Sequence, residues 1–147
     1  SSMGSVLHKT RIVAVLVNPL FDCTATIDFD GLVLVWGTAD GHQINAFTCD
    51  PLKESAKVTA ARFDGSYRRL YIGDANGGVR IFNWHNGVCI NVLESDATSE
   101  VTCIDNAASR TRRYTIASGW NRALYVWKDP PERYRQPLHY KLDPGCE

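Results

Sequence analysis

Three stretches of the sequence repeat one pattern: a short apolar strand, a polar turn, and a second strand that ends on an aromatic residue. These second strands end at Trp36, Phe82 and Trp127, which gives a period of about 45 residues. In the first stretch, residues 25–36, Gly31 can close the turn because glycine adopts positive φ without steric cost. A strand–turn–strand repeat at this period is typical of stacked four-stranded sheets. The sequence therefore predicts an all-β chain built from repeated units.

Each repeated stretch is completed by one strand before it and one after it. The leading strand of the first unit, residues 12–17, is almost continuously apolar, as expected for a strand buried between neighbouring sheets. A proline-bearing insertion at residues 129–137 delays the last strand of the third unit. No segment indicates a helix. Besides the first stretch, the expected strands are residues 12–17, 43–48, 58–63, 70–73, 79–82, 88–93, 101–105, 114–118, 123–127 and 138–142.

The pattern resembles the WD-repeat β-propeller family, whose blades carry a tight turn between two strands and end the second strand on Trp-Asp. The resemblance runs from about residue 8 to residue 142 and implies that residues 1–147 are one partial propeller. Its three blades of four-stranded antiparallel sheet are expected at about 8–48, 58–93 and 101–142.

The resemblance also implies a hydrogen-bonded tetrad of His, Ser or Thr, Asp and Trp in each complete blade. In the first blade the matching residues are His8, Thr26, Asp30 and Trp36. His8 and Asp30 could otherwise be read as a general base and acid. The tetrad register favours a structural role for both, in which they satisfy buried polar groups and hold the turn.

The other two blades depart from the tetrad. In the second blade the corresponding residues are Glu54, Ile72, Asn76 and Phe82, so we expect no tetrad there. The third blade keeps Asn121 and Trp127 but has Ala97 in place of the His. Its turn is expected to be one residue shorter, which puts Ser118 out of register.

Three blades do not close a ring, because propellers typically have about four to eight. Left open, the outer blades would expose apolar faces and strand edges. We therefore expect either that the chain is a piece of a longer propeller or, as the alternative, that two copies complete a six-bladed ring.

Composition excludes several classes of function. Hydrophobic residues at 44% and charged residues at 22% are ordinary for a globular protein, and no apolar run approaches the roughly 20 residues of a membrane helix. Five cysteines form an odd set without Cys-x-x-Cys, which favours reduced, structural thiols in an intracellular protein over a metal site. The Asp- and Gly-bearing turns at 28–31 and 74–78 lack the ligand ladder of a calcium loop. We expect no cofactor, no metal and no membrane partner.

The net charge of +0 hides an uneven distribution. In the family's strand order, the turns between first and second strands lie on one face. In the second and third blades these turns carry Arg68, Arg69, Arg110, Arg112 and Arg113, and only Asp64 opposes them. The other face carries most of the acidic side chains, namely Asp28, Asp30, Asp50, Glu54, Asp74, Glu94, Asp96 and Glu100, against Lys53, Lys57 and Arg122. Trp120 stands in a turn where a small residue would suffice, and Trp is enriched at interface hot spots. The alternative is that Trp120 packs across the turn onto the second blade. The candidate partner-binding residues are Arg68, Arg69, Arg110, Arg112, Arg113, Trp120 and Arg122.

These features favour a non-catalytic scaffold for protein–protein interaction. The turn 119–122 and the proline-rich run after Trp127 resemble the double-propeller WD-repeat and EF-hand proteins of cilia and flagella, which implies the cytoplasm or an axoneme. A ligand-binding or enzymatic propeller is the alternative, but it needs polar side chains in a central channel that apolar strands line here. A nucleic-acid-binding scaffold using the arginines is a third reading, weakened because only Tyr67 and Tyr114 lie beside them. Expected partners are other proteins in an assembly, and either the rest of the propeller or a second copy.

Overall fold

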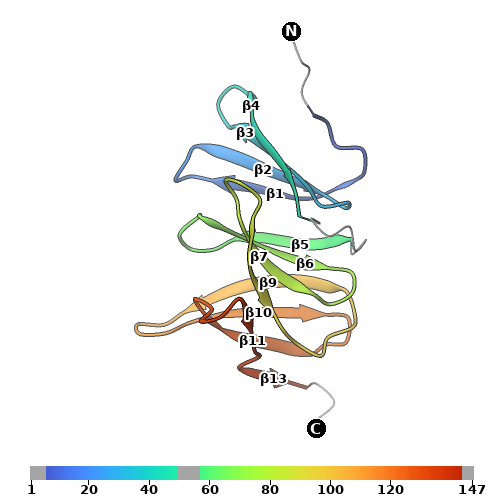
Figure 1. The fold of residues 1–147 in the computed structure, drawn as a ribbon, viewed down its shortest axis with the longest axis vertical. Coiled ribbons are helices and arrows are strands. Elements are labelled where there is room, and N and C mark those ends of the chain that lie inside the picture. Colours follow the sequence, from blue (N-terminus) through green and yellow to red (C-terminus); the bar gives the residue numbers. More distant parts are fainter. Residues whose placement is uncertain (1–5, 50–56, 144–147) are drawn as a thin grey trace.

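The computed structural model describes residues 6–49 and 57–143, and within these ranges it contains strands and turns but no helix. The strands form three antiparallel meanders that stack on one another, with the N-terminal sheet at the top of Figure 1 and the C-terminal sheet at the bottom. The predicted all-β class is confirmed.

Sequence-consecutive strands pair within each sheet. The first sheet consists of β1 (Ile12–Asn18), β2 (Cys23–Asp28), β3 (Leu32–Gly37) and β4 (Gln43–Thr48). The second consists of β5 (Val58–Phe63), β6 (Arg69–Asp74), β7 (Val79–Asn83) and β8 (Cys89–Leu93), joined at its outer edge by β12 (Arg135–Gln136). The third consists of β9 (Val101–Ala108), β10 (Arg113–Gly119), β11 (Leu124–Asp129) and β13 (Tyr140–Leu142).

The second sheet is buried on both faces, and β6 shows why. Successive side chains of a strand point to opposite faces. Leu70 and Ile72 accordingly pack into the core shared with the first sheet, while Tyr71 packs into the core shared with the third. All three are at most 1% exposed. Burial of each large apolar side chain contributes on the order of 2 kcal/mol, so the two cores hold the stack together.

The hairpin of β9 and β10 is longer than the sequence predicts. β9 continues to Ala108 instead of ending at residue 105, because Asn106, Ala107 and Ala108 pair with Thr115, Tyr114 and Arg113. The turn is closed by Ser109, whose N–H donates to the Arg112 carbonyl at 2.8 Å. The extension carries the arginines of this turn away from the body of the sheet (Figure 1).

Residues 130–137, called the strap here, form the insertion that delays the last strand of the third sheet. The sequence predicts a simple interruption, but the structure places β12 in parallel pairing with β8 of the neighbouring sheet, Arg135 opposite Val92 and Gln136 opposite Leu93. The Val92 N–H donates to the Tyr134 carbonyl at 2.7 Å. The strap therefore covers the outer edge of the second sheet with residues from the third.

Side chains reinforce this link between the second and third sheets. The Tyr71 hydroxyl donates to Asp129 Oδ1 at 2.7 Å, and the Trp127 indole N–H donates to the Glu94 carbonyl at 2.8 Å. Burial, together with the hydrogen bond to Asp129, raises the pKa of Tyr71, so the phenol stays a donor.

The first and third sheets each leave part of one face exposed. On β1, Leu16 packs into the core, whereas Val15 and Val17 point the other way and are 63% and 59% exposed. At the opposite end of the stack, Leu124 pairs with Leu142, and both are exposed. These uncovered apolar faces are of the kind that another sheet normally covers.

We expect the isolated chain to self-associate, because association would bury these two faces. Sedimentation velocity should show species larger than a 16.4 kDa monomer. The double variant Val15→Thr, Val17→Thr should shift the distribution toward the monomer, since it makes one face more polar without touching either core. A wild-type chain that sediments as a stable, cooperatively melting monomer would contradict this expectation.

Candidate functional site

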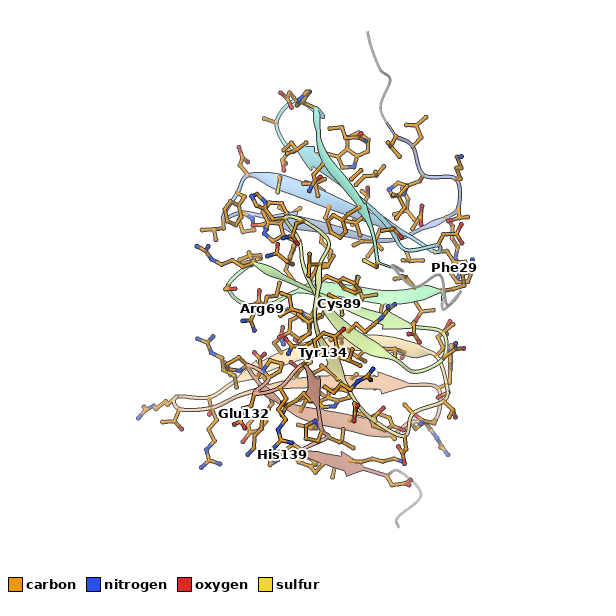
Figure 2. The ribbon with its side chains drawn as sticks, viewed as in Figure 1. Phe29, Arg69, Cys89, Glu132, Tyr134 and His139 are labelled. Carbon is orange, nitrogen blue, oxygen red and sulfur yellow. The ribbon has the colours of Figure 1, made fainter. Side chains whose placement is uncertain are left out.

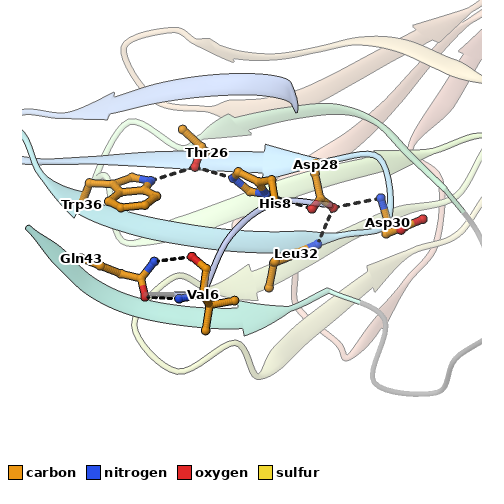
Figure 3. Close-up of polar contacts among 8 residues, drawn as sticks. All are labelled: Val6, His8, Thr26, Asp28, Asp30, Leu32, Trp36 and Gln43. Carbon is orange, nitrogen blue, oxygen red and sulfur yellow. Dashed lines mark hydrogen bonds and ion pairs between the residues drawn. The ribbon is translucent and has the colours of Figure 1, made fainter. Parts of the chain in front are cut away.

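A chain of polar groups ties the first sheet to the segment that precedes it (Figure 3). The Trp36 indole N–H donates to Thr26 Oγ1 at 2.9 Å. His8 lies between Thr26 Oγ1, 2.7 Å from Nε2, and Asp28 Oδ2, 2.9 Å from Nδ1. A neutral His8 with its proton on Nδ1 donates to the Asp28 carboxylate and accepts the Thr26 hydroxyl proton. This tautomer satisfies every member of the network.

The carboxylate of this network belongs to Asp28, and the sequence-based assignment to Asp30 is wrong. Asp28 is the last residue of β2 and lies on the same strand face as Thr26, two residues earlier. Its Oδ1 also accepts the backbone N–H groups of Asp30 and Leu32, each at 3.0 Å, which holds the turn (Figure 3). Asp30 lies in the turn itself and pairs with Lys57 Nζ at 2.5 Å. The two-residue spacing from Thr26 was the signal that could have identified Asp28.

The same correction applies to the second sheet. Asp74, and not Asn76, takes the place of Asp28, and its Oδ1 accepts the N–H groups of Asn76 and Gly78 at 2.9 and 2.8 Å. Ile72 and Phe82 replace the Thr and the Trp with apolar side chains buried in the structure. Glu54 lies outside the described residues. The second unit therefore has the carboxylate that holds the turn, but apolar side chains stand where the first unit has its Thr and its Trp.

The third sheet reaches the same turn shape by another route. Its turn is as long as the others, contrary to the sequence-based expectation, since Ser118 pairs with Leu124 just as Ile27 pairs with Val33. Gly119 follows Ser118 at the position of Asp28 and has no carboxylate. Asn121 substitutes for it, because its Oδ1 accepts the Ala123 N–H at 3.1 Å.

The remaining tetrad positions of the third sheet are also different. Ala117 occupies the register position of Thr26, as Thr115 pairs with Trp127 where Thr24 pairs with Trp36. The Trp127 indole instead donates across to Glu94 in the second unit. Ala97 contributes a methyl group to the core between the sheets. The tryptophan here links two sheets rather than two strands.

We expect Asp28→Ala to lower the free energy of unfolding by on the order of 2–3 kcal/mol, because it leaves His8 and two backbone N–H groups without an acceptor. The matched variant Asp30→Ala should cost less than about 0.5 kcal/mol, since it removes only an exposed ion pair. Urea unfolding followed by tryptophan fluorescence measures both. Equal losses in the two variants would contradict the assignment to Asp28.

Five of the six arginines predicted to bind a partner lie along one side of the stack, namely Arg68, Arg69, Arg110, Arg112 and Arg113. The turns β1–β2, β5–β6 and β9–β10 follow one another at the left of Figure 1, and Figure 2 labels Arg69 between the first and the third. Arg68 lies over the Phe21 ring, 5.7 Å from its centroid. Arg69 is half-buried in β6 opposite Asn83. The nearby Asp64 is committed to its own turn, where its carboxylate accepts the N–H groups of Arg68 and Arg69 at 3.2 and 3.1 Å.

The third turn carries the strongest positive charge. Arg110, Arg112 and Arg113 are exposed, and within residues 6–49 and 57–143 none of the three forms an ion pair. They border an open cleft of about 750 Å³ whose other wall includes Lys128 and Glu132. The strap thus contributes one wall of a cleft that the arginine turn forms on the other side.

Trp120 and Arg122 lie in the β10–β11 turn, at the opposite end of the sheet from the arginine turn (Figure 1). Trp120 is 74% exposed, and its indole N–H donates to Glu100 Oε2 at 2.5 Å. The alternative that Trp120 packs across onto the second sheet is therefore wrong. Arg122 is exposed and has a φ of 65°. The exposed indole ring, held by Glu100, is a second candidate contact surface.

The face that carries Trp120 is less acidic than the sequence suggests. Asp28 and Asp74 are buried, at 2% and 6% exposure, because their carboxylates hold the turns. Lys57 pairs with Asp30, and Lys141 pairs with Asp96 at 3.3 Å. The predicted charges Asp50, Lys53 and Glu54 lie outside the described residues. The contrast between the two faces rests more on the arginines than on the acids.

Metal and thiol chemistry find little support in the described residues. No group of three or more His, Cys, Asp and Glu side chains there could hold a metal ion. Cys23, Cys49, Cys89 and Cys103 are free thiols, and burial raises the pKa of Cys49 to about 12. None of the described segments is a helix long and apolar enough to span a membrane.

Comparison with known proteins identifies the repeat. No model of a protein family matches the chain. The chain is 27% identical over 123 residues to the WD repeat-containing protein on Y chromosome of Anopheles gambiae, and 27% identical over 128 residues to that of Drosophila virilis. Its fold matches the crystal structure of RRP9 WD40 repeats, with a TM-score of 0.75 over 94% of the chain at 16% identity. The chain is therefore similar in sequence and in fold to WD-repeat β-propeller proteins. Each of its sheets is a propeller blade.

The match covers only part of each relative. Alignments to the two insect proteins include 80% and 83% of this chain but 11% and 10% of theirs. The chain covers 40% of the RRP9 structure and 41% of the U3-55K structure, which has the same TM-score of 0.75 and 16% identity. The blades described here therefore span about a tenth of the length of the curated relatives.

Proposed function

We propose that these blades are a non-catalytic docking platform for other proteins within an assembly. The observation that carries the proposal is the β9–β10 turn, where three arginines without an ion pair in the described chain project beside an open cleft. Similarity to WD repeat-containing proteins supports an interaction role. The apolar face of the first blade supports a further partner, namely other blades of the same propeller or a second copy of the chain.

Exposed arginines act mainly on the rate of encounter. Charges in water attract a partner over a Debye length, about 8 Å at physiological ionic strength, and salt screens that attraction. Such charges raise the association rate more than they lower the dissociation rate. A docking surface built on the β9–β10 turn should therefore show a strong dependence of association on salt.

We expect the triple variant Arg110→Ser, Arg112→Ser, Arg113→Ser to associate with native partners about tenfold more slowly and with a flatter salt dependence. Surface plasmon resonance with partners captured from the native source measures both rates. The matched control is Lys9→Ser, Lys57→Ser, Lys141→Ser, which removes the same charge away from the turn and should leave association nearly unchanged. Equal slowing in both variants would indicate a non-specific effect of net charge.

Trp120→Ala separates the second candidate surface from the first in the same experiment. A hot-spot tryptophan contributes buried contact area, so its loss should speed dissociation, at a cost on the order of 2 kcal/mol. Its effect on folding should be small because the ring is largely exposed. If both variants bind native partners as the wild type does, neither surface is the docking site.

We further propose that the full-length protein is intracellular and belongs to a ciliary or flagellar axoneme. Support comes from the Gly119–Arg122 turn and the proline-bearing strap, which resemble double-propeller proteins of cilia and flagella. Fluorescent tagging of the full-length protein in ciliated cells tests the location. Signal along the axoneme that resists detergent extraction is the expected result, and a diffuse cytoplasmic signal would contradict the axonemal part of the proposal.

A further inference from the structure

An exposed apolar patch lies on the first blade. It adjoins the side of the stack that carries Arg68, Arg69 and the arginines of the β9–β10 turn, called the arginine row here. Leu20 and Phe21, in the β1–β2 turn, are 53% and 41% exposed. The Phe21 ring rests on Trp84, with centroids 5.0 Å apart, and Trp84 is only 6% exposed. Trp84 in turn contacts Phe63 in an edge-on arrangement. The patch therefore has a rigid aromatic base, which lowers the entropic cost of binding against it.

Arg68 joins this apolar patch to the arginine row. Its guanidinium lies over Phe21, 5.7 Å from the ring centroid. The two turns are also fixed to each other, because the Asn18 side chain donates to the Tyr67 carbonyl at 2.8 Å. An apolar contact and a cation are thus held side by side by groups from two blades.

The arginine row then continues toward the third blade. Arg69 lies on the same side of the stack (Figure 2), and the β9–β10 turn follows with Arg112 and Arg113. Lys128 adds a further cation on the wall of the cleft. The surface changes along its length from apolar at the first blade to cationic at the third.

We infer that this side of the three blades binds an extended protein segment in which an apolar side chain adjoins a run of acidic residues. The apolar side chain packs on Leu20 and Phe21, and the acidic run lies along the arginines toward Lys128. This inference rests on the proposed docking function and assigns the chemistry of the partner.

A nucleic-acid strand fits the same surface less well. Base stacking needs a free aromatic face, whereas the Phe21 ring has the Arg68 guanidinium 5.7 Å from its centroid and packs against Trp84. Leu20 offers an aliphatic contact without a ring.

Synthetic peptides test the inference on the full-length protein. Three fluorescein-labelled probes are compared by anisotropy: hexaglutamate preceded by Leu-Phe, hexaglutamate preceded by Ser-Ser, and hexaserine preceded by Leu-Phe. The first should bind about tenfold more tightly than either of the others, because each half contributes a contact of its own. The reversed sequence of the first probe covers the opposite chain direction.

Matched variants locate the two halves of the contact. Leu20→Ser should weaken the Leu-Phe hexaglutamate probe about tenfold and leave the Ser-Ser probe unchanged. Arg112→Ser with Arg113→Ser should weaken both acidic probes, whereas Lys9→Ser with Lys57→Ser should weaken neither. Leu20 is chosen for substitution over Phe21 because Phe21 is the ring that packs on Trp84, so the variant keeps both rings of the aromatic base.

The outcomes distinguish this inference from the docking function. The inference is overturned if Leu-Phe adds no affinity to hexaglutamate, if Leu20→Ser has no effect, or if an oligothymidine strand binds more tightly than the best peptide. In these cases, slower association of the triple arginine variant with native partners would still support docking. Failure of both experiments would reject the docking function as well.

Discussion

Packing between sheets is the interaction on which the rest of this structure depends. In β6, adjacent residues serve different cores: Ile72 meets the first blade and Tyr71 meets the third. If either face of the middle blade were exposed to water, several of its apolar side chains would no longer be buried. The burial of each contributes on the order of 2 kcal/mol. Polar networks, turns and exposed arginines are therefore positioned by a stack in which no blade is an independent unit.

The turns show that one backbone shape can be held by different side chains. In the first two blades a carboxylate at the end of the second strand, Asp28 or Asp74, accepts N–H groups of the turn. In the third blade Asn121 accepts one of these from a different position. The need to satisfy buried N–H groups is common to all three, whereas the His–Thr–Trp part is present only in the first among the described blades.

The periodic parts of the fold could be predicted from sequence, because apolar alternation and turn residues act locally. The same reasoning fails where two local choices look alike. Asp28 and Asp30 both flank Phe29. They differ because Asp28 ends the strand on the same face as Thr26, whereas Asp30 lies in the turn. The pairing of Gln136 with Leu93 could not be read from any pattern, because a two-residue strand carries no periodicity. The row of arginines was visible in sequence, but its junction with Phe21 through Arg68 depends on how two blades stack.

The strap also has a consequence for synthesis on the ribosome. The second blade has all of its own strands once Leu93 has emerged, yet its outer edge is covered only by Arg135 and Gln136, after β9, β10 and β11 have been made. Until then the N–H of Val92, which later donates to the Tyr134 carbonyl, is open to solvent or to another polypeptide. A nascent chain halted within the third blade would thus present an unpaired strand edge to chaperones. Completion of one blade is in this way delayed until its neighbour has been translated.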